Sequence, residues 1–183
     1  MIELVYETHA ISTDNEQGIA TGWLQGELSE RGRELARELG RRRRDDGLAA
    51  VFASDLRRAV ETAEFAFAGT EIPIRQDERL RECDYGDLNG GPAAEVAATK
   101  LSRIDTPFPN GESYVDVVER TRGFLADLLS EHHGTRVLLI AHSANRWAIE
   151  HLLHGRPLAD LIEEQFEWQP GWEYELRPAA TIL

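Results

Sequence analysis

Short apolar runs alternate with longer amphipathic stretches along this chain. Residues 2–8, 49–53 and 136–141 have the length and apolar content of buried strands. The stretches between them are long enough for helical crossovers, which place helices on both faces of a parallel sheet. The pattern predicts an α/β fold, a three-layer sandwich whose mainly parallel sheet is flanked by helices on both faces. Residues 172–176 alternate like an edge strand. The length suits a single domain over residues 1–183.

Capping residues and apolar periodicity predict where the helices lie. The expected helices run from a cap at Ser29 to about 44, from a cap at Ser54 or Asp55 to 67, and over about 93–102, 112–132 and 144–154. Two polar, glycine-containing stretches, 12–26 and 78–91, are expected to be loops. The first helix ends in the four arginines 41–44, which we interpret as solvated charges that complement the helix dipole.

The composition limits the classes of partner. The net charge is −13, which argues against nucleic acid and against an anionic membrane, because both attract basic surfaces. The single cysteine, Cys83, forms no internal disulfide and fits a reducing compartment. The sequence shows neither an apolar run of transmembrane length nor a signal-peptide pattern. We expect a cytoplasmic protein that acts on a small molecule, and leave open whether it is a monomer or a homodimer.

Two histidines follow two of the predicted strands. His9 comes directly after residues 2–8, and His142 comes directly after residues 136–141. Open parallel sheets bind ligands just beyond the carboxyl ends of their strands, so we expect both imidazoles in one pocket. Two histidines in one pocket suit either covalent phosphoryl chemistry or a metal ion.

Other segments supply the groups that phosphoryl chemistry needs. Arg58 opens the helix after the second strand, and Glu82 lies in a glycine-containing loop. A histidine nucleophile, a cation for the phosphoryl charge, a carboxylic acid for the leaving group and a second histidine form a complete set for phosphomonoester hydrolysis.

The order of these segments resembles the histidine phosphatase superfamily, which includes phosphoglycerate mutases. The resemblance rests on residues 28–32, 54–59, 80–86, 109–113 and 141–142, and it covers nearly the whole chain. It implies that His9 becomes phosphorylated, Arg58 binds the phosphoryl oxygens, Glu82 acts as general acid and then base, and His142 donates to the phosphoryl group. It also implies phosphate binding by Asn15, and we assign Thr8 and Ser143 beside the histidines to substrate binding. No metal or cofactor is expected.

The chain departs from the family at its first motif. Where the family has Arg-His-Gly, this chain has Thr8-His9-Ala10. A threonine offers one hydroxyl in place of a charged fork of donors, so another arginine is needed to restore the contact. Arg57, Arg81 and Arg146 each adjoin a motif residue, and we favour Arg146 because it follows His142 on the next helix.

These observations predict hydrolysis of a small phosphorylated metabolite, a phosphomonoester, through a phosphohistidine. The missing arginine leaves a second possibility, a catalytically weak or inactive phosphate-binding or regulatory protein on the same fold. A phosphoglycerate-type mutase is a third, although the short segment between Gly91 and Gly111 argues against the insertion that such mutases usually carry. A metallohydrolase that uses the two histidines is a fourth.

Overall fold

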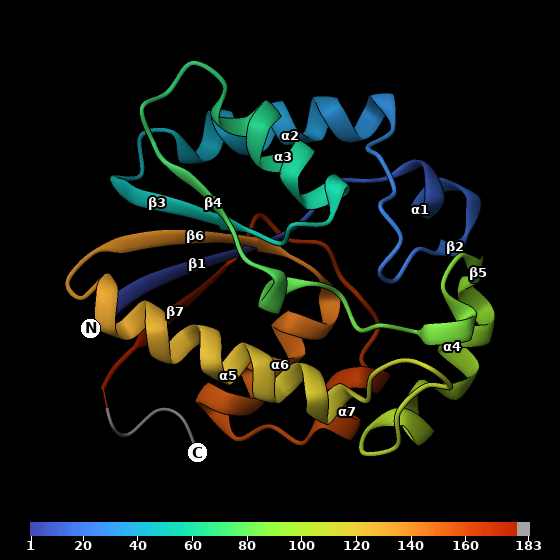
Figure 1. Cartoon of the computed structure of the whole chain (residues 1–183). Coiled ribbons are helices and arrows are strands. Elements are labelled where there is room, and N and C mark those ends of the chain that lie inside the picture. Colours follow the sequence, from blue (N-terminus) through green and yellow to red (C-terminus); the bar gives the residue numbers. More distant parts are fainter. Residues whose placement is uncertain (179–183) are drawn as a thin grey trace.

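A five-stranded sheet forms the centre of the computed structural model, which describes residues 1–178 (Figure 1). Its strand order is β4-β3-β6-β1-β7. The strands are β1 (Ile2–Thr8), β3 (Leu48–Ala53), β4 (Ile74–Gln76), β6 (Arg136–Ala141) and β7 (Trp172–Leu176). All neighbours pair in parallel except β7, which runs antiparallel along β1 at the sheet edge. The mainly parallel sheet and its edge strand are therefore confirmed.

Helices cover both faces of this sheet, as the alternation of the sequence predicts. The helices α2 (Glu30–Arg43) and α3 (Arg57–Phe67) pack on one face, where Val5 and Leu138 belong to their apolar cluster. The helices α5 (Tyr114–Glu131), α6 (Ser143–His154) and α7 (Leu158–Glu163) lie on the other side of the sheet (Figure 1). There the cluster includes Leu4 and Leu139, which alternate with the residues of the first face.

The register between the two central strands decides where the histidines lie. β1 pairs with β6 so that Thr8 faces Ala141. The pairing continues one residue further, because the backbone N–H of His9 donates to the carbonyl of Ala141 at 2.9 Å. The two residues that follow these strands, His9 and His142, therefore leave the sheet side by side.

Two helices begin later than the sequence predicts. Leu56 is the N-cap of α3, because the Ser54 hydroxyl accepts from the Leu56 N–H and the Asp55 carboxylate binds Arg81. The side chains expected to cap this helix thus shape the turn before it. The N-cap of α5 is Ser113, whose hydroxyl accepts from the Asp116 N–H at 3.2 Å.

Several short elements lie in segments predicted as loops or left unassigned. They are α1 (Thr13–Gln17), β2 (Ile19–Ala20), β5 (Gly91–Pro92), α7 and the 3₁₀ turns Glu78–Leu80 and Gly86–Leu88, whereas α4 (Ala93–Thr99) and the 3₁₀ turn Lys100–Arg103 lie where a helix over about 93–102 is predicted. Most are too short to show an apolar period in the sequence. Local capping holds α1, because the Asn15 N–H donates to the Ser12 hydroxyl and the Asn15 side chain accepts from the Ser12 N–H.

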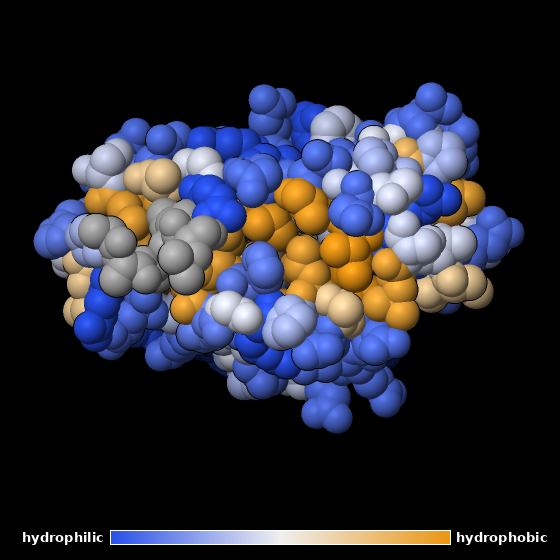
Figure 2. All heavy atoms as spheres, turned by 90° about the horizontal axis from the view of Figure 1, so that it is seen from below, coloured by the Kyte–Doolittle hydropathy of each residue, from blue (hydrophilic) through white to orange (hydrophobic). Residues whose placement is uncertain are grey.

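The face that carries α5, α6 and α7 shows apolar residues surrounded by hydrophilic ones (Figure 2). Large exposed apolar side chains are scattered over the chain, at Met1, Leu24, Leu101, Val115, Phe166 and Trp168. Within residues 1–178, we find no helix with the length and apolar character to cross a bilayer.

Candidate active site

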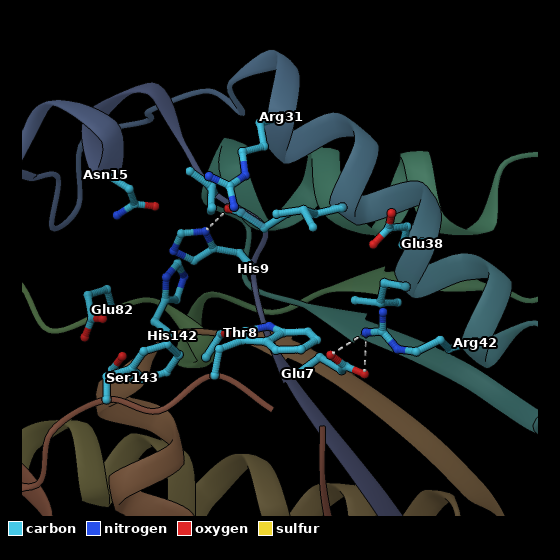
Figure 3. Close-up of a pocket in the computed structure, with 16 residues that line it drawn as sticks. Glu7, Thr8, His9, Asn15, Arg31, Glu38, Arg42, Glu82, His142 and Ser143 are labelled. Carbon is cyan, nitrogen blue, oxygen red and sulfur yellow. Dashed lines mark hydrogen bonds and ion pairs between the residues drawn. The ribbon is translucent and has the colours of Figure 1, made fainter. Parts of the chain in front are cut away.

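A cavity of about 710 Å³ opens at the carboxyl ends of β1 and β6. Residues from β1, α2 and the start of α6 line it (Figure 3). Six of the eight predicted site residues are among those lining it: Thr8, His9, Asn15, Glu82, His142 and Ser143. The cavity thus lies where open parallel sheets bind their ligands, just beyond the carboxyl ends of the strands.

The two histidines meet in this cavity, as predicted. Their ring centroids are 5.0 Å apart. The Nδ1 of His9 lies 2.7 Å from the carbonyl oxygen of Ala10, which can only accept a hydrogen bond. Nδ1 therefore carries the proton, and the lone pair of His9 lies on Nε2. Burial, and then the charge of Arg58, lower the pKa of His9 to about 3, so the ring is neutral near pH 7.

His142 carries its proton on the opposite nitrogen. Its Nδ1 lies 3.4 Å from the Nη2 of Arg58, which can only donate, so the neutral ring holds its proton on Nε2. That Nε2 is buried and has no hydrogen-bond partner among the described residues. Burial and the nearby Arg58 charge hold the pKa of His142 well below its usual range. The cavity therefore contains an unused donor beside an unused nucleophilic lone pair.

Backbone contacts fix the position of the second ring. The Tyr6 hydroxyl donates to the carbonyl of His142, and the His142 N–H donates to the side chain of Asn145 at 3.3 Å. His142 is also the N-cap residue of α6, so the helix begins at the cavity.

Arg58 lies beside His142 but is not among the residues that line the cavity. Its side chain is buried, and it donates to the carbonyls of Leu24 at 3.0 Å and Gly22 at 2.8 Å. Its charge reaches both imidazoles and lowers their pKa.

Glu82 is a half-buried carboxyl group at the cavity. Burial raises its pKa, against the lowering effects of the Cys83 N–H and of the Arg58 charge. Two hydrogen bonds hold its main chain in place, because Trp23 Nε1 and Arg120 Nη2 donate to its carbonyl at 2.7 and 2.9 Å. Sequence reasoning missed this role of Arg120, which lies 38 residues away on α5.

The arginines expected to replace the missing one lie elsewhere. Arg146 stacks over the ring of Trp172 at 4.8 Å and does not line the cavity. Arg57 pairs with Glu27 and Glu61 on the surface, and Arg81 binds Asp55. The expectation that Arg146 compensates for Thr8 is thus not supported by its position.

Two arginines that sequence reasoning missed do line the cavity, Arg31 and Arg42. Arg42 Nη2 lies 3.2 and 3.3 Å from the two carboxylate oxygens of Glu7, and Arg43 Nε lies 3.1 Å from one of them. Glu7 is only 3% exposed. The prediction that the four arginines 41–44 are simply solvated charges at a helix end therefore does not hold for Arg42 and Arg43. The signal was Glu7 itself, a carboxylate at an apolar strand position, which needs a partner.

The cavity also holds the remaining predicted polar groups. The Asn15 side-chain oxygen accepts from the Ser12 N–H, which leaves its amide nitrogen as a donor. Ser143 is the first residue of α6. Within residues 1–178, no three histidine, cysteine or acidic side chains are grouped so that they could hold a metal ion.

A family model of the histidine phosphatase superfamily, branch 1, matches residues 8–170. The chain belongs to the histidine phosphatase superfamily. The match begins at Thr8 and includes all eight predicted site residues.

Named members of the superfamily are similar to the chain over most of its length. It is 28% identical to the phosphoserine phosphatase 1 of Hydrogenobacter thermophilus over 78% of this chain and 72% of that protein. It is 32% identical to the 2,3-bisphosphoglycerate-dependent phosphoglycerate mutase of Methylobacterium radiotolerans, over 98% and 92%. Among solved structures, the mycobacterial glucosyl-3-phosphoglycerate phosphatase with VO3 superposes with a TM-score of 0.78 at 31% identity, over 87% and 85%.

These similarities support a phosphatase or mutase enzyme.

Proposed function

We propose that this histidine phosphatase superfamily member hydrolyses a small phosphomonoester through a phosphohistidine on His9. The observation that carries the proposal is the pair of ring nitrogens. The Nε2 of His9 has a free lone pair, and the Nε2–H of His142 is buried without a partner within the described residues. A phosphoryl group satisfies both, because its phosphorus accepts the attack and its oxygens accept the hydrogen bond.

In the first step, the Nε2 of His9 attacks phosphorus and the ester P–O bond breaks. The leaving oxygen takes the proton of the Glu82 carboxyl group, whose pKa is raised by burial, which favours the protonated form. The alcohol departs, His9 carries the phosphoryl group, and Glu82 is left as a carboxylate. His142 donates to a phosphoryl oxygen and stabilises the charge in the transition state.

In the second step, water enters where the alcohol has left. The Glu82 carboxylate takes a proton from this water as its oxygen attacks phosphorus. The P–N bond to His9 breaks, phosphate leaves, and both His9 and Glu82 return to their starting protonation states. No step requires a metal ion or a cofactor.

Thr8 favours a second candidate, a protein that binds phosphate and turns it over poorly. The loss of one charge-assisted contact costs about 1.5–3 kcal/mol. That cost corresponds to about one to two decades in rate if the contact is made in the transition state.

Steady-state hydrolysis tests the proposal. We expect wild-type protein to hydrolyse p-nitrophenyl phosphate and at least one compound of a phosphometabolite panel between pH 5 and 8, and His9→Ala to be inactive. Equal rates for wild type and His9→Ala would contradict it. Calorimetric binding of phosphate or vanadate without turnover would favour the second candidate. Formation of 2-phosphoglycerate from 3-phosphoglycerate would identify a mutase.

A further inference from the structure

The cavity is lined by three acidic side chains and by two arginines. Glu7 and Glu38 line it together with Glu82, whereas its arginines are Arg31 and Arg42. A phosphoryl group brings further negative charge into this space, and its transfer requires cations or donors at its oxygens.

Arg42 is not available for this purpose. Both of its close contacts are to the carboxylate oxygens of Glu7, which is buried and also binds Arg43. Releasing Arg42 would leave a buried carboxylate with fewer partners, which is costly. Arg58 is engaged in a similar way, by the carbonyls of Gly22 and Leu24.

Arg31 is the arginine in the cavity whose guanidinium has no hydrogen bond or ion pair within residues 1–178. Its side chain reaches from α2 toward the ring of His9 (Figure 3). An arginine is permanently charged and presents a planar fork of donors that matches phosphate oxygens.

Close packing fixes the backbone beside Arg31. Its neighbour Gly32 lies so near the chain after His9 that a Cβ on it would be 1.9 Å from the carbonyl oxygen of Ile11. The Ser29 N–H donates to the same carbonyl at 3.1 Å, and the Ser29 hydroxyl accepts from the Gly32 N–H at 3.1 Å. The first turn of α2 is thus fixed against the backbone two residues beyond His9.

We propose that Arg31 binds the phosphoryl group on His9 and so takes the place of the arginine that Thr8 lacks. The inference rests on the proposed phosphoryl transfer at His9. The positive charge then comes from α2, on the other side of the cavity from Thr8, where the family motif would place its arginine.

Arg31→Ala tests this role, with Arg33→Ala as the matched control. Both substitutions remove one charge from the first half of α2, and Arg33 does not line the cavity. We expect Arg31→Ala to lower kcat/KM for p-nitrophenyl phosphate about 10- to 150-fold and to weaken vanadate binding by a similar factor. We expect Arg33→Ala to change both less than about two-fold, and Arg31→Lys to fall between Arg31→Ala and wild type.

The vanadate titration separates this inference from the proposed function. If wild type binds vanadate with the expected dependence on Arg31 but hydrolyses no phosphomonoester, the proposed function fails and the assignment stands. If Arg31→Ala and Arg33→Ala behave alike in both assays, the assignment is overturned. Wild-type protein that binds no vanadate would overturn both.

A double-mutant cycle tests whether Arg31 and position 8 serve the same group. We expect Thr8→Arg to increase kcat/KM at least ten-fold more in the Arg31→Ala background than in wild type, because the second arginine then restores a missing contact. The same fold increase in both backgrounds would contradict a shared phosphoryl contact.

Discussion

The exchange Glu82→Gln separates the two proton transfers of the proposed mechanism. The substitution keeps the shape of the side chain. The Glu82 Oε1 accepts from the Cys83 N–H at 2.8 Å, and the oxygen of a glutamine amide accepts in the same way. Burial already raises the pKa of this carboxyl group and so favours its neutral form, and a neutral amide therefore suits the site. What the variant loses is the transferable proton.

The size of the effect depends on the leaving group. Positioned general acid–base catalysis contributes about 10²–10⁴-fold. With an alkyl phosphate such as glycerol 2-phosphate, the alcohol needs a proton to leave, so we expect kcat/KM to fall by about 10²–10⁴-fold. With p-nitrophenyl phosphate, the phenolate leaves without help, so phosphorylation of His9 stays fast and only the attack of water slows.

Rapid mixing makes this difference visible. Glu82→Gln with p-nitrophenyl phosphate is expected to release a burst close to one p-nitrophenolate per active site, followed by a slow steady state. The control is Glu78→Gln in the same loop, whose side chain is 76% exposed, and which we expect to leave both substrates unaffected. Equal losses for both substrates without a burst would refute the assignment of Glu82 as proton donor and base.

Three further outcomes are expected. Because the folded protein holds the pKa of His9 near 3, below the ordinary value of 6.5, the unfolded state binds the extra proton on acidification. The free energy of unfolding should therefore fall between pH 6.5 and 3, by up to about 1.4 kcal/mol per pH unit for this proton, and less steeply in His9→Asn; an unchanged slope in that variant would count against it. Glu7→Gln should lower the free energy of unfolding in urea by about 1–3 kcal/mol, because Arg42 and Arg43 lose a buried partner, while Glu38→Gln, which removes an exposed carboxylate, should change it by under about 0.5 kcal/mol. Phosphatase activity should be unchanged after dialysis against excess EDTA, and loss of activity restored by a divalent metal would point to a metallohydrolase.

The sequence predicted the parts of the site that follow directly from strand ends. His9 and His142 meet because each continues a strand, and β1 and β6 are neighbours in the sheet. Apolar periodicity reveals strands and their ends, and the family motifs supply the likeness to phosphatases.

The cations could not be predicted in this way. Arg146 is close to His142 in sequence, yet its side chain stacks on Trp172 of the edge strand. Arg31 is 22 positions from His9 along the chain and reaches it because Gly32 allows a close approach of helix and backbone. Such contacts depend on tertiary packing, which one-dimensional patterns do not contain.

The central claim is covalent phosphorylation of His9, and chemical trapping tests it most directly. Protein is mixed with ³²P-labelled p-nitrophenyl phosphate, quenched within one turnover and digested for mass spectrometry. We predict one phosphate per chain on the peptide that contains His9, stable in base and labile in acid as a P–N bond requires, with more label in Glu82→Gln and none in His9→Ala. Turnover without label, or label on another residue, would contradict the account.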